Sequence, residues 1–156
     1  MKARFLIITS LSSLAVLVID QLSKYLIIKK IPDTGIFLFN KALSFDLVYN
    51  PGISFGLRMP SWTIVTITII MIAFLVYFIY NQIKQKNYFI TLLISLVTAA
   101  AISNFADRVF RNGVVDFVSV QINGFAWPSF NFADAVITIC AIILIILIIK
   151  KEKVKA

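Results

Sequence analysis

The sequence predicts an all-α membrane protein, with four transmembrane helices and a small β-rich cap on one side of the membrane. The chain of 156 residues is 60% hydrophobic and only 14% charged, and its mean hydropathy of +0.96 is far above that of a soluble domain. Its apolar residues form four stretches, each close to the roughly 20 residues with which a helix crosses about 30 Å of hydrocarbon. These stretches are residues 5–28, 62–80, 88–105 and 133–149, and we expect a single integral membrane domain.

The first stretch has a basic start and an apolar centre, a combination that is also typical of a cleaved signal peptide. However, it contains Asp20 and Lys24, and its end has no small-residue cleavage site. We therefore expect it to remain as the first membrane helix. No Cys lies near residue 20, so the chain is not expected to be a lipoprotein precursor itself.

The distribution of Lys and Arg predicts the orientation in the membrane. Basic residues are dense in three short segments that four crossings place on one side: Lys2, Arg4, Lys84, Lys86, Lys150, Lys151, Lys153 and Lys155. The positive-inside rule then puts both termini in the cytoplasm and the loops at about residues 29–61 and 106–132 outside. The same topogenic charges explain the net charge of +8. We expect no nucleic-acid partner, because no basic stripe with interleaved aromatic residues is present.

The two outer loops contain patterns typical of β-structure. Residues 42–49 alternate between two faces like a half-buried strand, and Asn50-Pro51-Gly52 then predicts a turn. Residues 114–122 also alternate and lead into Asn123-Gly124, a strong hairpin signal. We expect a small cap, with a short helix or loop beside it, at the outer interface. Aromatic residues suited to that interface include Tyr25, Trp62 and Trp127.

Missing residue types exclude several kinds of chemistry. The chain has no His, which excludes a Ser-His-Asp triad, a Cys-His pair, an HExxH zinc site and a His-bound haem. No glycine-rich phosphate loop is present, so no nucleotide is expected. The single Cys140 lies in the fourth apolar stretch and is most simply a packing residue. Carboxylate, amide, hydroxyl, Lys and Arg groups remain, and we expect neither metal nor cofactor.

Polar residues from four separate segments should reach the same depth, at the outer surface of the bilayer. Asp20 and Lys24 lie one helical turn apart near the outer end of the first helix. The others are Asn104, Asp107 and Arg108 at the outer end of the third helix, Asp116 in the loop that follows it, and Asn131 and Asp134 at the start of the fourth helix.

Each group also has a simpler role. Asp20–Lys24 could be a surface ion pair, Asp107–Arg108 a helix-end anchor, and Asn131 or Asp134 a helix cap. Their convergence at one depth favours a shared site.

Asp116 and Asp134 are the candidates for catalysis. Two carboxyl groups held a few Å apart cannot both ionise cheaply, so the pair shares one proton near neutral pH. The ionised member can take a proton from an attacking water, and the protonated member can donate a hydrogen bond to the developing oxyanion. This is the chemistry of an aspartic peptidase.

Five motifs, taken in order along nearly the whole chain, resemble those of bacterial lipoprotein signal peptidase, or signal peptidase II. They are Asp20-x-x-x-Lys24, Asn50-Pro51-Gly52-Ile53-Ser54-Phe55-Gly56, Ser103-Asn104-Phe105-Ala106-Asp107-Arg108, Val115-Asp116-Phe117 and Trp127-Pro128-x-Phe130-Asn131-x-Ala133-Asp134. Any one motif is weak, but the ordered set is highly specific.

The resemblance implies an intramembrane aspartic endopeptidase of the bacterial cytoplasmic (inner) membrane, with its active site at the outer-leaflet face. Its substrates would be prolipoproteins, cut just before a Cys that carries a diacylglyceryl group. Asp116 and Asp134 would be the catalytic pair, without an assignment of the base. The residues expected to bind substrate or support the site are Asn50, Gly52, Asn104, Arg108, Asn131, Ala133, Asp20, Lys24 and Asp107. The family's loop between the first two helices forms a β-cradle that holds the substrate.

The chain departs from the family before Asn104, where the family usually has Gly and this chain has Ser103. The preceding Ala99-Ala100-Ala101 keeps the residues small, so close helix approach is still expected. The fine packing behind the site, and substrate preference, are the properties that this change affects.

Two other functions are compatible with acids in a membrane. A small four-helix transporter or proton-coupled channel subunit would also carry intramembrane carboxylates, but at the bilayer midplane and beside broken helices. A serine–lysine peptidase would use Lys24, although the adjacent Ser23 points elsewhere on the helix.

Overall fold

The computed structural model describes residues 2–32, 34–39, 42–52, 59–122 and 124–153, with side chains through Lys150. The expected residues Ile53, Ser54, Phe55, Gly56 and Asn123 lie outside the described residues. In chain order the elements are α1 (Lys2–Lys30), β1 (Ile36–Leu38), β2 (Leu43–Asn50), α2 (Ser61–Lys84), α3 (Tyr88–Arg111), β3 (Val114–Ile122), β4 (Phe125–Phe130) and α4 (Phe132–Lys153).

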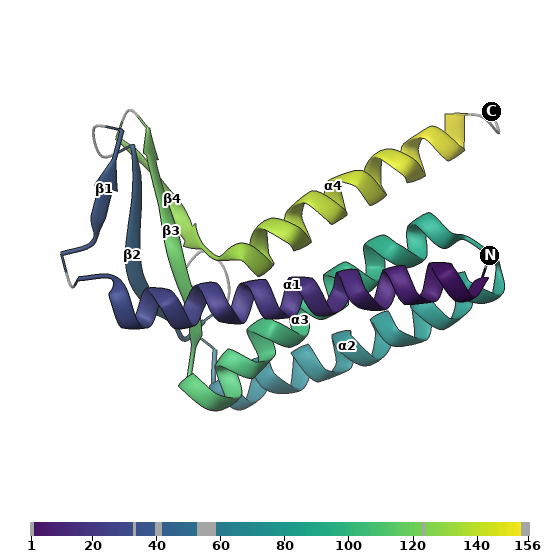
Figure 1. Ribbon diagram of the computed structural model, residues 1–156, viewed down its shortest axis with the longest axis horizontal. Helices are drawn as coiled ribbons and strands as arrows, with labels where there is room; N and C mark the ends of the chain where they lie inside the picture. The colour runs from purple at the N-terminus through teal and green to yellow at the C-terminus, as the bar shows by residue number, and fades with distance from the viewer. Residues whose placement is uncertain (1, 33, 40–41, 53–58, 123, 154–156) are drawn as a thin grey trace.

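The four helices and the small sheet confirm the expected fold class. Each helix is long and apolar enough to cross a membrane, and many of the large apolar side chains of the helices are exposed, as in a protein solvated by lipid. The central helix is α3, which packs against α1, α2 and α4. Figure 1 shows the sheet at one end of the bundle, and the start of α1 and the end of α4 at the other.

The third helix is longer than its apolar stretch predicts. It ends at Arg111 rather than near residue 105, because Asp107 and Arg111 form an ion pair one turn apart and Asp107 is buried. Asn112 then ends the helix in the left-handed conformation, with a φ of 59°. The polar end of α3 therefore belongs to the helix and not to the following loop.

Small residues allow three helices to approach closely beneath the sheet. Val16 of α1, Ala99 and Ala100 of α3, and Ala133 of α4 form one buried cluster. Ala100 and Ala133 have no exposed surface. The close helix approach expected at Ala99 and Ala100 is therefore present.

The outer segments form one antiparallel sheet in the order β1-β2-β3-β4. The alternating segments predicted as strands are β2 and β3, although a bulge between Phe45 and Val48 interrupts the alternation of β2. β4 is the partner that the hairpin signal indicated, and Gly124 of its turn has a φ of +82°. β1 has only three residues, and the sequence pattern did not indicate it. Within the described part of these segments, no helix accompanies the sheet beyond the last turns of α1 and α3.

Candidate active site

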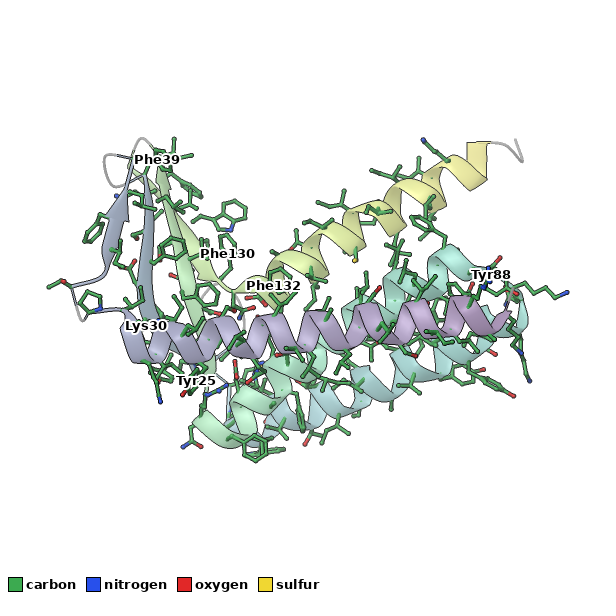
Figure 2. All side chains as sticks on the ribbon, in the orientation of Figure 1. Tyr25, Lys30, Phe39, Tyr88, Phe130 and Phe132 are labelled. Atoms are coloured by element: carbon green, nitrogen blue, oxygen red, sulfur yellow. The ribbon has the colours of Figure 1, made fainter. Side chains whose placement is uncertain are left out.

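Asp116 and Asp134 come from two elements that the sheet–helix junction brings together. Asp116 lies in β3 and is 3% exposed, whereas the half-buried Asp134 lies in the first turn of α4. β4 leads almost directly into α4, and Figure 2 shows Phe130 and Phe132 on either side of that junction. The only residue between β4 and α4 is Asn131, so its position is fixed by both.

Asn131 connects the two carboxyl groups. Its Nδ2 donates a hydrogen bond to Oδ1 of Asp116 at 2.8 Å and a longer one to Oδ1 of Asn104 at 3.2 Å. Asn104 in turn donates from Nδ2 to Oδ1 of Asp134 at 2.8 Å. The two acids are thus joined through a chain of two buried amides.

The start of α4 has a reciprocal cap. Oδ1 of Asn131 accepts the backbone N–H of Asp134 at 2.9 Å, and Oδ2 of Asp134 accepts the backbone N–H of Asn131 at 3.3 Å. The expectation that these residues cap a helix is therefore correct, and the same two side chains also face Asp116. The capping role and the site role are compatible.

A third amide holds the other oxygen of Asp116. Asn50, at the end of β2, donates from Nδ2 to Oδ2 of Asp116 at 3.1 Å, and its Oδ1 accepts the backbone N–H of Gly52 at the same distance. The guanidinium of Arg108 donates to the backbone oxygens of Asn104 at 3.2 Å and Gly52 at 3.4 Å. Arg108 therefore ties the turn after β2 to the end of α3.

Behind the carboxyl pair lies a buried ion network. Nζ of Lys24 lies 2.6 Å from Asp20 and 2.7 Å from Asp107, and all three side chains have no exposed surface. Nζ also donates to Oδ1 of Asn104 at 2.8 Å. Because the side chains of Asp20 and Asp107 are fully buried, a surface ion pair does not fully explain Asp20, and a helix-end anchor does not fully explain Asp107.

The buried carboxylates also position backbone next to the two acids. Oδ1 of Asp20 accepts the backbone N–H of Ala133 at 2.8 Å, immediately before Asp134. Oδ2 of Asp107 accepts the backbone N–H of Val115 at 3.2 Å, immediately before Asp116. The structure thus brings together all eleven residues expected at the site.

Three further residues of this network escaped the sequence reasoning as site residues. Gln21 donates from Nε2 to Oγ of Ser103 at 2.9 Å and to Asp107 at 3.0 Å, and Ser103 donates to Oδ2 of Asp20 at 2.7 Å. Arg111 pairs with Asp107 and donates to Oε1 of Gln21 at 2.9 Å. The four-residue spacing of Arg111 from Asp107 was a signal for the pair, whereas nothing in the sequence connects Ser103 with Asp20. The departure at Ser103 therefore adds a hydroxyl that has a partner on each side.

The contacts also decide between the chemical alternatives. Lys24 is engaged by Asp20, Asp107 and Asn104, and Ser23 donates to the backbone oxygen of Asp20 in its own helix at 2.7 Å. This arrangement gives no support to a serine–lysine pair. The four helices are continuous, and the acids lie at one end of the bundle rather than at its middle, unlike the sites of transporters. Among the described residues, no group of His, Cys, Asp and Glu could hold a metal ion.

The surroundings of Asp116 favour its protonated form. Burial raises the pKa of Asp116 to about 6, and the negative charge of Asp134 raises it further, while the hydrogen bonds from Asn50 and Asn131 and the charge of Lys24 act against the rise. Asp116 therefore keeps its proton to a higher pH than an exposed Asp does.

An apolar hollow of about 280 Å³ opens beside Asp134. Its lining comes from β4 and the first turns of α4: Trp127, Phe130, Asp134, Ala135, Thr138 and Ile139. A second hollow of similar volume on the sheet shares Trp127 and Phe130 with it. Apolar surface therefore continues from the sheet to Asp134.

Comparison with known proteins yields consistent matches. A family model described as signal peptidase (SPase) II matches residues 12–150. A lipoprotein signal peptidase of Thermodesulfovibrio yellowstonii is 34% identical over 145 residues, which cover 92% of this chain and 95% of that protein. A bacterial membrane enzyme solved in meso at 2.3 Å resolution has a TM-score of 0.82 and 36% identity, covering 95% of this chain and 91% of that one. A second such structure, at 1.9 Å resolution, has a TM-score of 0.78 and 35% identity, covering 91% and 92% respectively.

Proposed function

The chain belongs to the signal peptidase II family, and we propose on that premise that Asp116 and Asp134 are the two carboxyl groups with which it cuts its substrate. Family membership makes it an aspartic protease, a multi-pass membrane protein that removes signal peptides from prolipoproteins. The observation that carries the proposal is the amide chain through Asn131 and Asn104, because it holds one oxygen of each carboxyl group in a fixed orientation.

The two acids have different roles in the proposed mechanism. Asp116 keeps the shared proton, since burial and the charge of Asp134 favour its protonated form. Asp134 is then the base that takes a proton from the attacking water, and Asp116 donates a hydrogen bond to the carbonyl oxygen as it becomes negative. Collapse of the tetrahedral intermediate breaks the peptide bond, and the leaving amine takes a proton from the pair.

The pH dependence of cleavage follows from this assignment. The pKa of Asp116 is about 6, so the proton that the reaction needs is present below this pH and lost above it. We expect kcat/KM to fall as pH rises through about 6, with a one-proton slope. The corresponding fall in kcat should come at higher pH, because bound substrate excludes water and favours the protonated acid further.

Initial rates measured from about pH 4.5 to about pH 8.5 test this assignment. A kcat/KM that instead rises through about pH 6 to a plateau would make Asp116 the base and Asp134 the acid.

The substrate that we propose is a prolipoprotein whose Cys already carries a diacylglyceryl group. The apolar hollow beside Asp134 supports this choice, since it suits acyl chains better than a polar peptide. Acyl chains also hold the Cys at the membrane surface. A lipid-bearing Cys would therefore place the scissile bond near the carboxyl pair.

The test is cleavage of a purified prolipoprotein by the detergent-solubilised enzyme, with and without the diacylglyceryl group. We expect the unlipidated form to have a kcat/KM at least about a hundredfold lower, because the binding energy of the acyl chains no longer positions the peptide bond. Equal cleavage of both forms would contradict the proposed substrate class. Nucleotides and nucleic acids should leave the rate unchanged.

We further propose that the sheet and the carboxyl pair face the outer side of the cytoplasmic membrane. The basic residues remote from the sheet support this orientation: Lys2, Arg4, Lys84 and Lys150 lie in α1, α2 and α4, and Lys86 lies in the turn between α2 and α3. Both termini are then cytoplasmic, and the apolar signal helix of the substrate can reach the site laterally from the membrane.

A further inference from the structure

Lys24 is the most completely buried cation at the site. It has no exposed surface, and its ammonium group contacts Asp20, Asp107 and Asn104. A buried ammonium is retained only where negative charge compensates it. Two carboxylates contact it directly, whereas one negative charge would be enough to neutralise its single positive charge.

Among the residues that the structure describes, the charged groups around Lys24 come from α1, α3, β3 and α4. They are Asp20 and Lys24 of α1, Asp107, Arg108 and Arg111 of α3, Asp116 of β3, and Asp134 of α4. This set has four carboxyl groups and three cations. It is therefore electrically neutral when one of the four carboxyl groups is protonated.

The extra proton belongs to the pair of acids. Asp20 and Asp107 both contact Lys24, and Asp107 also pairs with Arg111, so each already has a cation beside it. Within the described part of the chain, the side-chain contacts of Asp116 and Asp134 are with amides and not with cations. Neutrality of the cluster thus corresponds to one proton on the Asp116–Asp134 pair.

Lys24 is connected to that pair through a single amide side chain. Its Nζ donates to the same Asn104 whose Nδ2 donates to Asp134, at 2.8 Å in each case. Arg111 is 27% exposed in its side chain, and Arg108 is half-buried, so solvent attenuates their charges more than that of Lys24.

We propose that Lys24 is a positioning residue whose charge, held against the pair through Asn104, keeps Asp116 and Asp134 at one shared proton. This inference rests on the proposed function, because it assumes that the pair is catalytic. Removal of the positive charge leaves the cluster one unit too negative, and the pair then binds protons more strongly. Removal of the negative charge of Asp20 has the opposite effect.

The experiment follows protonation of the pair directly, by infrared titration of the purified protein in detergent. The carboxyl signal is assigned by its loss in Asp116→Asn. For Lys24→Met, which keeps the apolar stem, we expect the titration midpoint to rise by roughly one to two pH units. For Asp20→Asn we expect a fall, and for the double variant Asp20→Asn/Lys24→Met a return to within about half a unit of the unaltered protein.

The matched control is Lys29→Met, which makes the same substitution in an exposed lysine of α1. Its midpoint should stay where it is in the unaltered protein. The cleavage profile of each active variant should move with its infrared midpoint.

An unchanged midpoint in Lys24→Met overturns the proposal, as does a double variant displaced as far as the single one. If Lys24→Met does not fold, the Asp20→Asn variant tests the proposal instead. An unchanged or raised titration midpoint in Asp20→Asn contradicts the proposed charge balance. The titration does not depend on turnover. Unaltered cleavage by Asp116→Asn would count against the proposed function, while unmoved midpoints count against the role of Lys24 alone.

Discussion

Asp116→Asn and Asp134→Asn are each expected to lower the rate of prolipoprotein cleavage at least about a thousandfold. The amide has nearly the volume of the carboxyl group, but it can neither hold the shared proton nor accept one from water. At position 116 the change also turns an NH₂ group toward the amide of Asn50 or Asn131, both of which donate to the present carboxylate. The measurement is the initial rate with a diacylglyceryl-modified prolipoprotein in detergent.

Asp46→Asn provides the matched control. Asp46 is a half-buried carboxyl group of β2 in the same sheet, and it accepts a hydrogen bond from Ser44 at 2.6 Å rather than facing the pair. We expect it to cleave within about twofold of the unaltered protein. Normal processing by either Asp116→Asn or Asp134→Asn, in protein whose thermal unfolding is cooperative, would remove that residue from the mechanism.

Asp107→Ala should produce the largest loss of stability, about 3–5 kcal/mol in the free energy of unfolding. Asp107 has no exposed surface and pairs with both Lys24 and Arg111. It also accepts the backbone N–H of Val115 and the amide of Gln21. The change leaves a buried ammonium with one carboxylate fewer and a buried N–H without its acceptor, and each of these costs free energy.

Thermal or denaturant unfolding in a single detergent provides the measurement. Lys29→Ala is the comparison variant, because its ammonium is exposed and lies 4.6 Å from the ring centre of Tyr25. We expect that variant to lose no more than about 1 kcal/mol. If Asp107→Ala also loses no more than this in the free energy of unfolding, the ion network contributes little to holding α1, α3 and β3 together.

The membrane spans were predictable because a lipid-facing helix must be apolar over its whole length, whatever its neighbours. The position at which α3 ends was not predictable. Asp107 and Arg111 interrupt the apolar pattern and remain helical only through their pairing and burial. β2 and β3 were visible as alternation. The three-residue β1 has too few positions for a pattern and depends on its pairing with β2.

Most residues of the site were predictable as a set, because polar groups at one depth of a membrane need partners, whereas Asn50, Gly52 and Ala133 followed only from the family resemblance. Their connections required the structure. Asn131 touches Asp116 and Asn104 at once only because β3, β4 and α3 meet there, and Ser103 reaches Asp20 across 83 residues of sequence. The catalytic role of the two acids remains a prediction from chemistry and family pattern.

The reciprocal cap at the start of α4 links the folding of this helix to the catalytic activity of the protein. Asp134 closes the first turn of its helix with one oxygen and accepts from Asn104 with the other, so the first turn of α4 also positions the proposed base. A molecule in which this turn is frayed has a misplaced base, and a molecule with a well-placed base has the turn formed. Molecules in which this turn is not formed should therefore be inactive, and not merely have a lower rate. The specific activity of a preparation would then be proportional to its fraction of correctly folded molecules.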